Sequence, residues 1–150
     1  MQQQQQSFSE AAGLLIRART TGRALIQQRG TAARSHPGTW ELSAGGSVEP
    51  PETPLQAAFR EAREELGPLP VLIVVNPGVQ VLHTMPTKAH IYHVFEAWSE
   101  NEFRPRIPNP DIVSGWAWTL DPLEYNLMPA VEDELRALDA VRDVPHHWLG

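Results

Sequence analysis

Three glutamates, Glu61, Glu64 and Glu65, lie three and four residues apart, and this spacing is where the sequence first indicates chemistry. On an α-helix such residues share one face, so their carboxylates would gather and repel one another. A helix that only faced solvent would be expected to mix lysines among them. A divalent cation such as Mg²⁺ removes the conflict, because it takes oxygen ligands from carboxylates, water and substrate phosphates. The spacing therefore indicates a cation site.

The element that must position these carboxylates is a helix with clear start and stop signals. Thr53 is placed to cap it, with Gln56 at the spacing of a capping box and Pro54 at the first helical position. Gly67 followed by Pro68 predicts its end. The apolar residues at helical spacing are Leu55, Ala58, Phe59, Ala62 and Leu66.

The stretch 45–67 resembles the Nudix box of the Nudix hydrolases, a pattern of fixed glycine, glutamate and arginine positions. Those positions are filled in order by Gly46, Glu52, Arg60, Glu61, Ala62, Glu64, Glu65 and Gly67. The departure is Pro68, where the family usually has a bulky aliphatic residue. So many fixed positions make the match far more specific than a lone glycine motif.

The resemblance implies roles for the residues of the box. Glu64 and Glu65 match the principal metal ligands of the family, and Glu61 commonly joins them. The backbone carbonyl of Gly45 matches a further ligand. The cofactor implied is Mg²⁺, with Mn²⁺ as a substitute. Arg60 more often pairs with carboxylates in this family than with substrate, so it is expected to hold acidic side chains in place.

Two roles stay open at this point. Glu52 can take part in catalysis directly or only hydrogen-bond into the acidic network. The general base is Glu61 within the box or Asp111 on a distant loop, where some relatives carry a glutamate. Asp is also common in turns after proline, and this structural interpretation of Asp111 is favoured.

Substrate contacts are predicted from residues near the box. Trp40 precedes the glycines at a place where relatives often have an aromatic residue, and it could stack on a base. The alternative is a tryptophan packed in the core. Arg29 and Arg34 could contact phosphates, with solvated surface as the alternative for each.

The rest of the chain shows further strands and one more helix. A hairpin is expected from 11–19 and 23–29, and a short strand over 40–42 leads into a glycine loop. Later elements are a buried strand 71–75, an extended segment 79–83, an alternating strand 90–98, a loop 100–111, a strand 115–120, a helical turn 121–124 and an amphipathic helix 129–142. Strands on both sides of a central helix indicate an α/β fold with a mixed sheet between helices.

The Nudix fold is such an α/β/α sandwich, so the resemblance implies one Nudix hydrolase domain over residues 11–150. Residues 1–10 begin with a glutamine tract and are expected to be disordered. The chain length of 150 residues agrees with one domain.

The composition of the chain excludes some classes of binding partner. The net charge of −6 argues against a binder of duplex nucleic acid, which needs a basic face. The sequence has no cysteine, no apolar run long enough for a membrane span and no signal-peptide pattern at its start. A cytoplasmic protein is therefore expected. The resemblance implies a small nucleotide-type substrate, and it leaves a homodimer as an open alternative because many family members are dimers.

The resemblance implies a Mg²⁺-dependent hydrolase of nucleoside diphosphates linked to another group, a nucleotide pyrophosphatase in which water attacks a diphosphate phosphorus. One alternative is a non-catalytic module that senses a nucleotide, although such proteins usually lose glutamates of the box. The other is an isomerase of the isopentenyl diphosphate kind, which depends on a cysteine that this chain does not have.

Overall fold

The computed structural model describes residues 7–76, 78–85 and 88–141. In chain order they form β1 (Ser7–Ala18), β2 (Ala24–Arg29), β3 (Trp40–Glu41), β4 (Ala44–Ser47), α1 (Pro54–Leu66), β5 (Ile73–Val74), β6 (Val79–Met85), β7 (Lys88–Ser99), β8 (Val113–Thr119), a 3₁₀ turn η1 (Pro122–Glu124) and α2 (Val131–Val141). Within these residues neither helix is long and apolar enough to cross a membrane.

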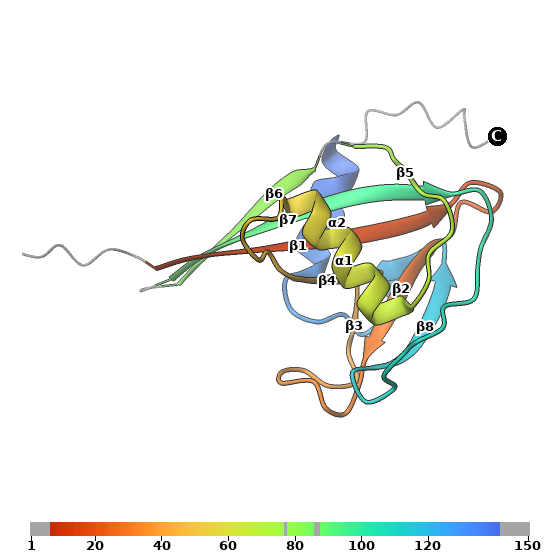
Figure 1. Ribbon diagram of the computed structural model, residues 1–150, viewed down its shortest axis with the longest axis horizontal. Coiled ribbons are helices and arrows are strands. Elements are labelled where there is room, and N and C mark those ends of the chain that lie inside the picture. The colour runs from red at the N-terminus through yellow and green to blue at the C-terminus, as the bar shows by residue number, and fades with distance from the viewer. Residues whose placement is uncertain (1–6, 77, 86–87, 142–150) are drawn as a thin grey trace, which may run out of the picture.

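Strand β1 lies in the middle of one mixed sheet (Figure 1). It pairs in parallel with β7 and antiparallel with β2 and β4. Strand β8 pairs with β2 on the edge away from β1, β3 pairs with the other end of β2, and β5 and β6 both pair with β7. The predicted hairpin and the predicted alternating strand are confirmed, and so is the mixed character of the sheet.

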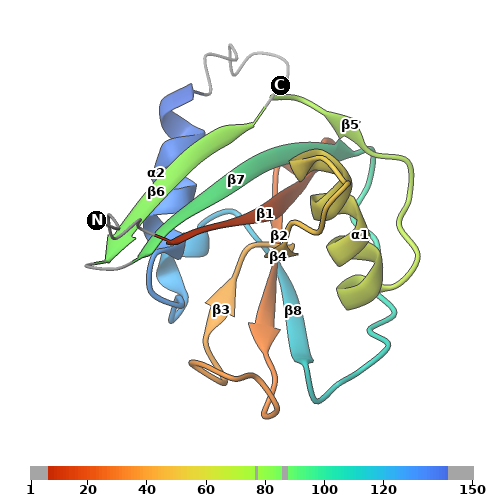
Figure 2. The ribbon, with the colours of Figure 1, turned by 60° about the vertical axis from the view of Figure 1, so that its left-hand side comes forward.

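The two helices cover opposite faces of this sheet (Figure 2). In β1, Leu14 and Ile16 pack toward α1, whereas the intervening Leu15 packs toward α2. Strand β7 alternates in the same way, with Phe95 on the α1 side and Val94 on the α2 side. Because successive strand residues face opposite sides, both faces are buried and both must be apolar. This arrangement is the predicted α/β/α sandwich.

Helix α1 begins and ends where the sequence predicted. The Thr53 hydroxyl accepts from the Gln56 backbone N–H at 3.2 Å, and the Gln56 side chain accepts from the Thr53 N–H at 2.8 Å. Gly67 follows the last turn at φ +80°, a conformation that favours glycine. Leu55 and Phe59, expected inward, are only partly buried. The buried side chains are Ala57, Ala58, Ala62 and Leu66.

The N-terminal boundary expected at residue 11 is wrong. Strand β1 begins at Ser7 because the ladder with β7 runs without a break from the pair Ser7 and Lys88 to the pair Ala18 and Ser99. Residues 1–6 of the glutamine tract lie outside the described residues. So do residues 142–150, including the last residue of the helix predicted over 129–142.

The buried strand predicted over 71–75 is also wrong. Strand β5 is only two residues long, and it pairs with β7 alone at the edge of the sheet. Val71 is 86% exposed and Ile73 is 67% exposed. A run of β-branched residues predicts extended backbone, but whether that backbone is covered depends on neighbours that are distant in sequence.

The glycines expected to form a loop lie in a strand. Gly45 and Gly46 belong to β4, where they pair with Gly13 and Ala12 of β1. A Cβ atom on Gly45 or Gly13 would overlap the side chain of Tyr92, which crosses this strand pair. Glycine is needed here for close approach rather than for a turn.

The capping box provides a test of the helix boundary. We expect Thr53→Ala to lower the free energy of unfolding by about 1 kcal/mol, because it removes the acceptor of an otherwise unpaired N–H. Thr53 is exposed, so loss of buried surface adds little. Urea unfolding followed by circular dichroism measures the change. Thr53→Ser keeps the acceptor and serves as the control; equal destabilisation by both variants would contradict the capping role.

Candidate active site

All three glutamates of the predicted cation site line one cavity. It has a volume of about 160 Å³ and lies between α1 and the segment that leads into β8. Its lining residues are Glu61, Glu64, Glu65, Asn109, Ile112 and Val113. Helical spacing therefore brings the glutamates to one place, and the loop before β8 covers that place.

The guanidinium of Arg60 contacts three carboxylates. Its Nε and Nη2 atoms donate to Glu52 at 3.0 and 2.8 Å. Its Nη1 atom donates to Glu61 at 2.9 Å and to Glu64 at 3.3 Å. Nη2 also donates to the carbonyl of Ser47 at 2.8 Å, which ties the group to β4. A planar fork suits such multiple contacts, and the positioning role inferred for Arg60 remains a prediction that this geometry supports.

The contact between Arg60 and Glu52 shifts the pKa of both groups. The hydrogen bond to Glu52 raises the pKa of Arg60 above its ordinary value, and contacts with Glu61 add to this effect. The same hydrogen bond lowers the pKa of Glu52, helped by the backbone N–H of Glu49. Both groups are therefore charged at neutral pH, and Glu52 is held outside the cavity.

Glu65 points from α1 toward β2 and β4. The Gln27 amide donates to Glu65 at 2.7 Å and to Glu41 at 3.0 Å, and the Gly45 N–H approaches Glu65 at 3.4 Å. Burial raises the pKa of Glu65 well above its ordinary value, and the nearby Glu61 and Glu41 raise it further. The hydrogen bond from Gln27 opposes that rise.

The side chains of this cavity fit a hard divalent cation by their chemistry. Glu61 lies close enough to Glu65 to raise the pKa of Glu65, a conflict that a bound cation would relieve. A Cβ on Gly46 would overlap the Glu61 carboxyl, so glycine leaves the room that this group needs. Glu64 is paired with Arg60 and its side chain is 58% exposed. Within residues 7–76, 78–85 and 88–141, no three acidic or histidine side chains already converge as a metal cage.

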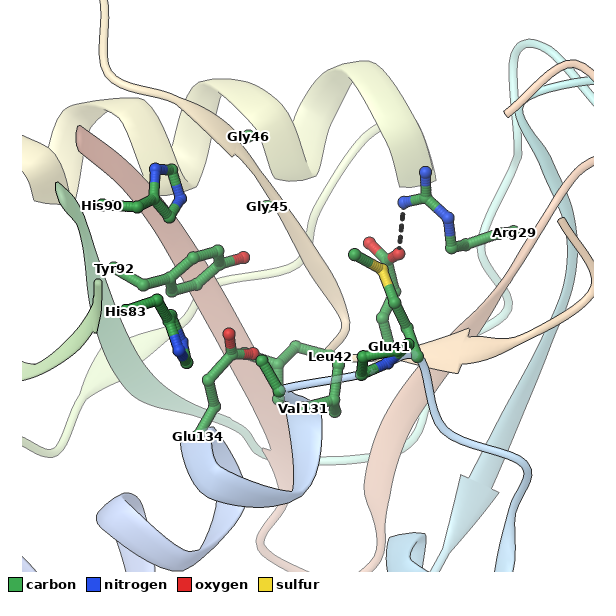
Figure 3. A pocket seen from close by; sticks show the side chains of 13 residues that line it. Arg29, Glu41, Leu42, Gly45, Gly46, His83, His90, Tyr92, Val131 and Glu134 are labelled. Atoms are coloured by element: carbon green, nitrogen blue, oxygen red, sulfur yellow. Dashed lines mark hydrogen bonds and ion pairs between the residues drawn. The ribbon is translucent and has the colours of Figure 1, made fainter. Parts of the chain in front are cut away.

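A second cavity has a volume of about 230 Å³ and is shown in Figure 3. Arg29 and Glu41 line one end, where the Arg29 guanidinium donates to Glu41 at 2.7 Å. Gly45 and Gly46 line this cavity and also lie next to the partly buried Glu65 and Glu61 of α1. Strand β4 thus borders the larger, mostly apolar cavity and also contacts two of the glutamates that line the acidic one.

Of the residues predicted to contact substrate, one lies at the larger cavity and the others lie elsewhere. Arg29 lines the larger cavity. Trp40 lines neither cavity, and its ring packs edge-on against Tyr125 with centroids 5.0 Å apart. Arg34 is exposed in the loop between β2 and β3. Asp111 is exposed in a turn, where its backbone N–H donates to the Asn109 side chain at 3.0 Å.

Sequence reasoning missed several polar residues of the site. Gln27 lies on the same face of β2 as the core residue Leu25, so strand alternation alone placed a polar side chain inward. Glu134 lies three residues after Val131 and four before Leu138, both buried, so helical spacing also placed it inward. In both cases a polar residue stood where the strand or helix pattern expects an apolar one, and this mismatch could have identified the two residues.

Comparisons with known proteins agree with this geometry. The NUDIX domain family matches residues 8–140. The CTP pyrophosphohydrolase of Escherichia coli K12 is 35% identical over 123 residues, which cover 81% of this chain and 85% of the relative. The isopentenyl-diphosphate Delta-isomerase of Streptomyces coelicolor is 35% identical over 101 residues, 65% of this chain, but the match spans only half of that relative's length.

Among solved structures, a Nudix hydrolase from M. smegmatis, RenU, superposes with a TM-score of 0.76 at 26% sequence identity. The match covers 91% of this chain and 88% of that one. The architecture described above is therefore shared across almost the whole chain.

The bridge made by Gln27 gives a test of the site's packing. We expect Gln27→Leu to lower the free energy of unfolding by about 1–3 kcal/mol, because Glu41 and Glu65 lose their common donor inside the protein. Urea unfolding without added metal measures this change. Gln28→Leu, which removes a hydrogen bond at an exposed position, is the matched control, and an equal effect of the two variants would contradict the bridging role.

The acidic groups also predict how stability depends on pH. Burial raises the pKa of Glu134 to about 8, with Glu41 and Asp133 adding to the rise. The folded protein then binds more protons than the unfolded chain between about pH 4.5 and 8, so stability falls as pH rises through this window. The slope contributed by one group is at most about 1.4 kcal/mol per pH unit.

Urea unfolding in EDTA at a series of pH values measures that slope. Glu134→Gln should reduce the slope by the contribution of one group, because an amide does not titrate, while Glu65 continues to contribute. Glu132→Gln, on the exposed side of the same helix, should leave it unchanged. A slope in Glu134→Gln equal to that of the wild type would show that Glu134 does not contribute to the dependence.

Proposed function

This chain belongs to the NUDIX domain family, and on that premise we propose that it is a divalent-cation-dependent hydrolase of nucleoside diphosphates linked to another group. The observation that supports this most is that β4 lies next to two different cavities. One is lined by three glutamates of α1, and the other is larger, mostly apolar and bordered by Arg29. The relative named CTP pyrophosphohydrolase supports a nucleotide substrate.

The residues proposed to hold the cation are Glu61, Glu64, Glu65 and the carbonyl of Gly45. Oxygen donors favour Mg²⁺, with Mn²⁺ as a substitute. When bound, the ion neutralises charge on the phosphates and helps to form hydroxide from water. Arg60 keeps its carboxylates at fixed places through the contacts described above, and Gln27 does the same for Glu65.

The reaction proposed is attack of water on a phosphorus of the diphosphate. A phosphorus–oxygen bond forms, the bond to the bridging oxygen breaks, and a nucleoside monophosphate and a phosphorylated second product leave. Arg29 lies where it can contact a phosphate once it leaves Glu41. Glu61 is our candidate to accept the proton of the water, because it lines the acidic cavity and Asp111 does not.

An isomerase acting on isopentenyl diphosphate is the competing activity, because relatives with that name match part of the chain. The complete set of glutamates and the absence of cysteine from the sequence favour hydrolysis. A sensing module is disfavoured by the same complete box. A cytoplasmic location and a homodimer remain predictions.

The experiment that tests hydrolysis is a panel of nucleoside triphosphates, dinucleotides, nucleotide sugars and ADP-ribose, with products identified by mass. We expect at least one of them to release a nucleoside monophosphate with Mg²⁺, and EDTA to abolish this release. Glu64→Gln and Glu65→Gln should each lower kcat by about a thousandfold or more while the fold survives.

Glu132→Gln is a matched control, because Glu64 and Glu132 have equal side-chain exposure, 58%, and each pairs with an arginine four residues away. Turnover in the Glu64 or Glu65 variants equal to that of Glu132→Gln would remove the proposed metal site. Mg²⁺-dependent nucleotide binding without any product would support a sensor instead.

A further inference from the structure

Glu134 is a buried carboxyl that the proposed reaction does not use. It lies in the first turn of α2 and is only 5% exposed. Its side chain lines the 230 Å³ cavity and points into it (Figure 3). Among the described residues, no donor or acceptor pairs with this carboxyl. A buried polar group without a partner is costly, so such a group in a cavity indicates a ligand that supplies the partner.

The polar groups around Glu134 share this lack of partners within the described residues. The hydroxyl of Tyr92 has no hydrogen bond there, and the Nε2 atom of His83 is buried without one. Both side chains line the same cavity, on the wall formed by β6 and β7. The end of the cavity near α2 is therefore an apolar space with several polar atoms free to pair with a ligand.

The protonation of Glu134 decides what it can bind. The titratable or charged groups near it are Asp133 on its own helix, Glu41 and Arg29 from β3 and β2, and His83, His90 and Tyr92 from β6 and β7. Burial, Glu41 and Asp133 raise the pKa of Glu134 to about 8. At neutral pH the carboxyl is therefore mostly protonated, and it presents an O–H donor beside a C=O acceptor.

A neighbouring donor and acceptor on Glu134 match a ligand that has an acceptor and a donor side by side. Nucleobases present an acceptor next to a donor on the edge that pairs with other bases. A neutral carboxyl can hydrogen-bond both at once. An isoprenoid chain offers no polar atom and would leave Glu134 unpaired, which a polar site rejects much more strongly than a small misfit in an apolar one.

We propose that Glu134 is a specificity-determining residue that hydrogen-bonds the donor and acceptor edge of the substrate's nucleobase and thereby excludes isoprenoid diphosphates. The inference rests on the proposed function and names its substrate class. In Figure 3, Glu134 and Arg29 lie at opposite sides of the cavity, and Gly45 and Gly46 lie along a third side on β4. A nucleotide whose base contacts Glu134 would extend its phosphates toward Arg29 and the glutamates of α1.

Calorimetric binding with the full chain in EDTA tests this role apart from catalysis. The probes are CMP, UMP, AMP, GMP and isopentenyl diphosphate, and the proteins are wild type, Glu134→Gln and Glu134→Leu. An amide keeps one donor and one acceptor, so Glu134→Gln should bind the preferred monophosphate within about threefold of wild type. Glu134→Leu should bind it about 10- to 100-fold more weakly, with its affinity for isopentenyl diphosphate unchanged or improved.

The dependence on pH gives a second readout that does not need the leucine variant to fold. Wild-type affinity should fall between pH 7 and 9 as Glu134 loses its proton, and the affinity of Glu134→Gln should not. Glu132→Leu, an exposed change on the same helix, controls for damage to α2.

The outcomes separate this inference from the function on which it rests. Equal binding by wild type and Glu134→Leu, or the same pH profile in wild type and Glu134→Gln, overturns the role of Glu134 and leaves hydrolysis standing. Weak binding by both variants overturns the neutral-acid interpretation. A wild-type protein that binds none of the monophosphates and hydrolyses no nucleotide overturns the proposed function itself.

Discussion

The site depends on one electrostatic constraint: helix α1 holds acidic side chains close together although their negative charges repel one another. Arg60 relieves part of this repulsion by contacting Glu52, Glu61 and Glu64 with a single guanidinium. It does not reach Glu65, which is held by the Gln27 amide and carries the raised pKa. The unrelieved part of the repulsion lies at the cavity, where a cation is chemically most useful.

Two glycines of β4 allow side chains to approach the backbone closely, and this places the acidic residues near the larger cavity. Strand β4 has no Cβ at Gly45 and Gly46, so Tyr92 can cross it on one side and Glu61 can press against it on the other. The two cavities are therefore only one strand apart. In the proposed function, a nucleotide bound in the larger cavity would have its phosphates near this strand.

Local signals predicted the parts of this fold that local interactions determine. The ends of α1 follow from a capping box and a glycine, and the β1–β2 hairpin follows from the residues of its turn. Partners distant in sequence determined the rest. The exposure of β5, the strand character of Gly45 and Gly46, and the early start of β1 all depend on pairing with β7 or β1. Gln27 and Glu134 were missed because the groups that they face come from other elements.

The long parallel ladder between β1 and β7 also has a consequence for the order of events during folding. Its twelve residue pairs join positions 81 apart in sequence, and α1 lies between them. Such non-local pairing loses much chain entropy before stabilising contacts form, so folding should be slow for a chain of this size. The face that buries α1 is incomplete until β7 has left the ribosome. A nascent chain stopped before residue 88 would therefore hold α1 against β1 and β4 but without the contacts that β7 adds.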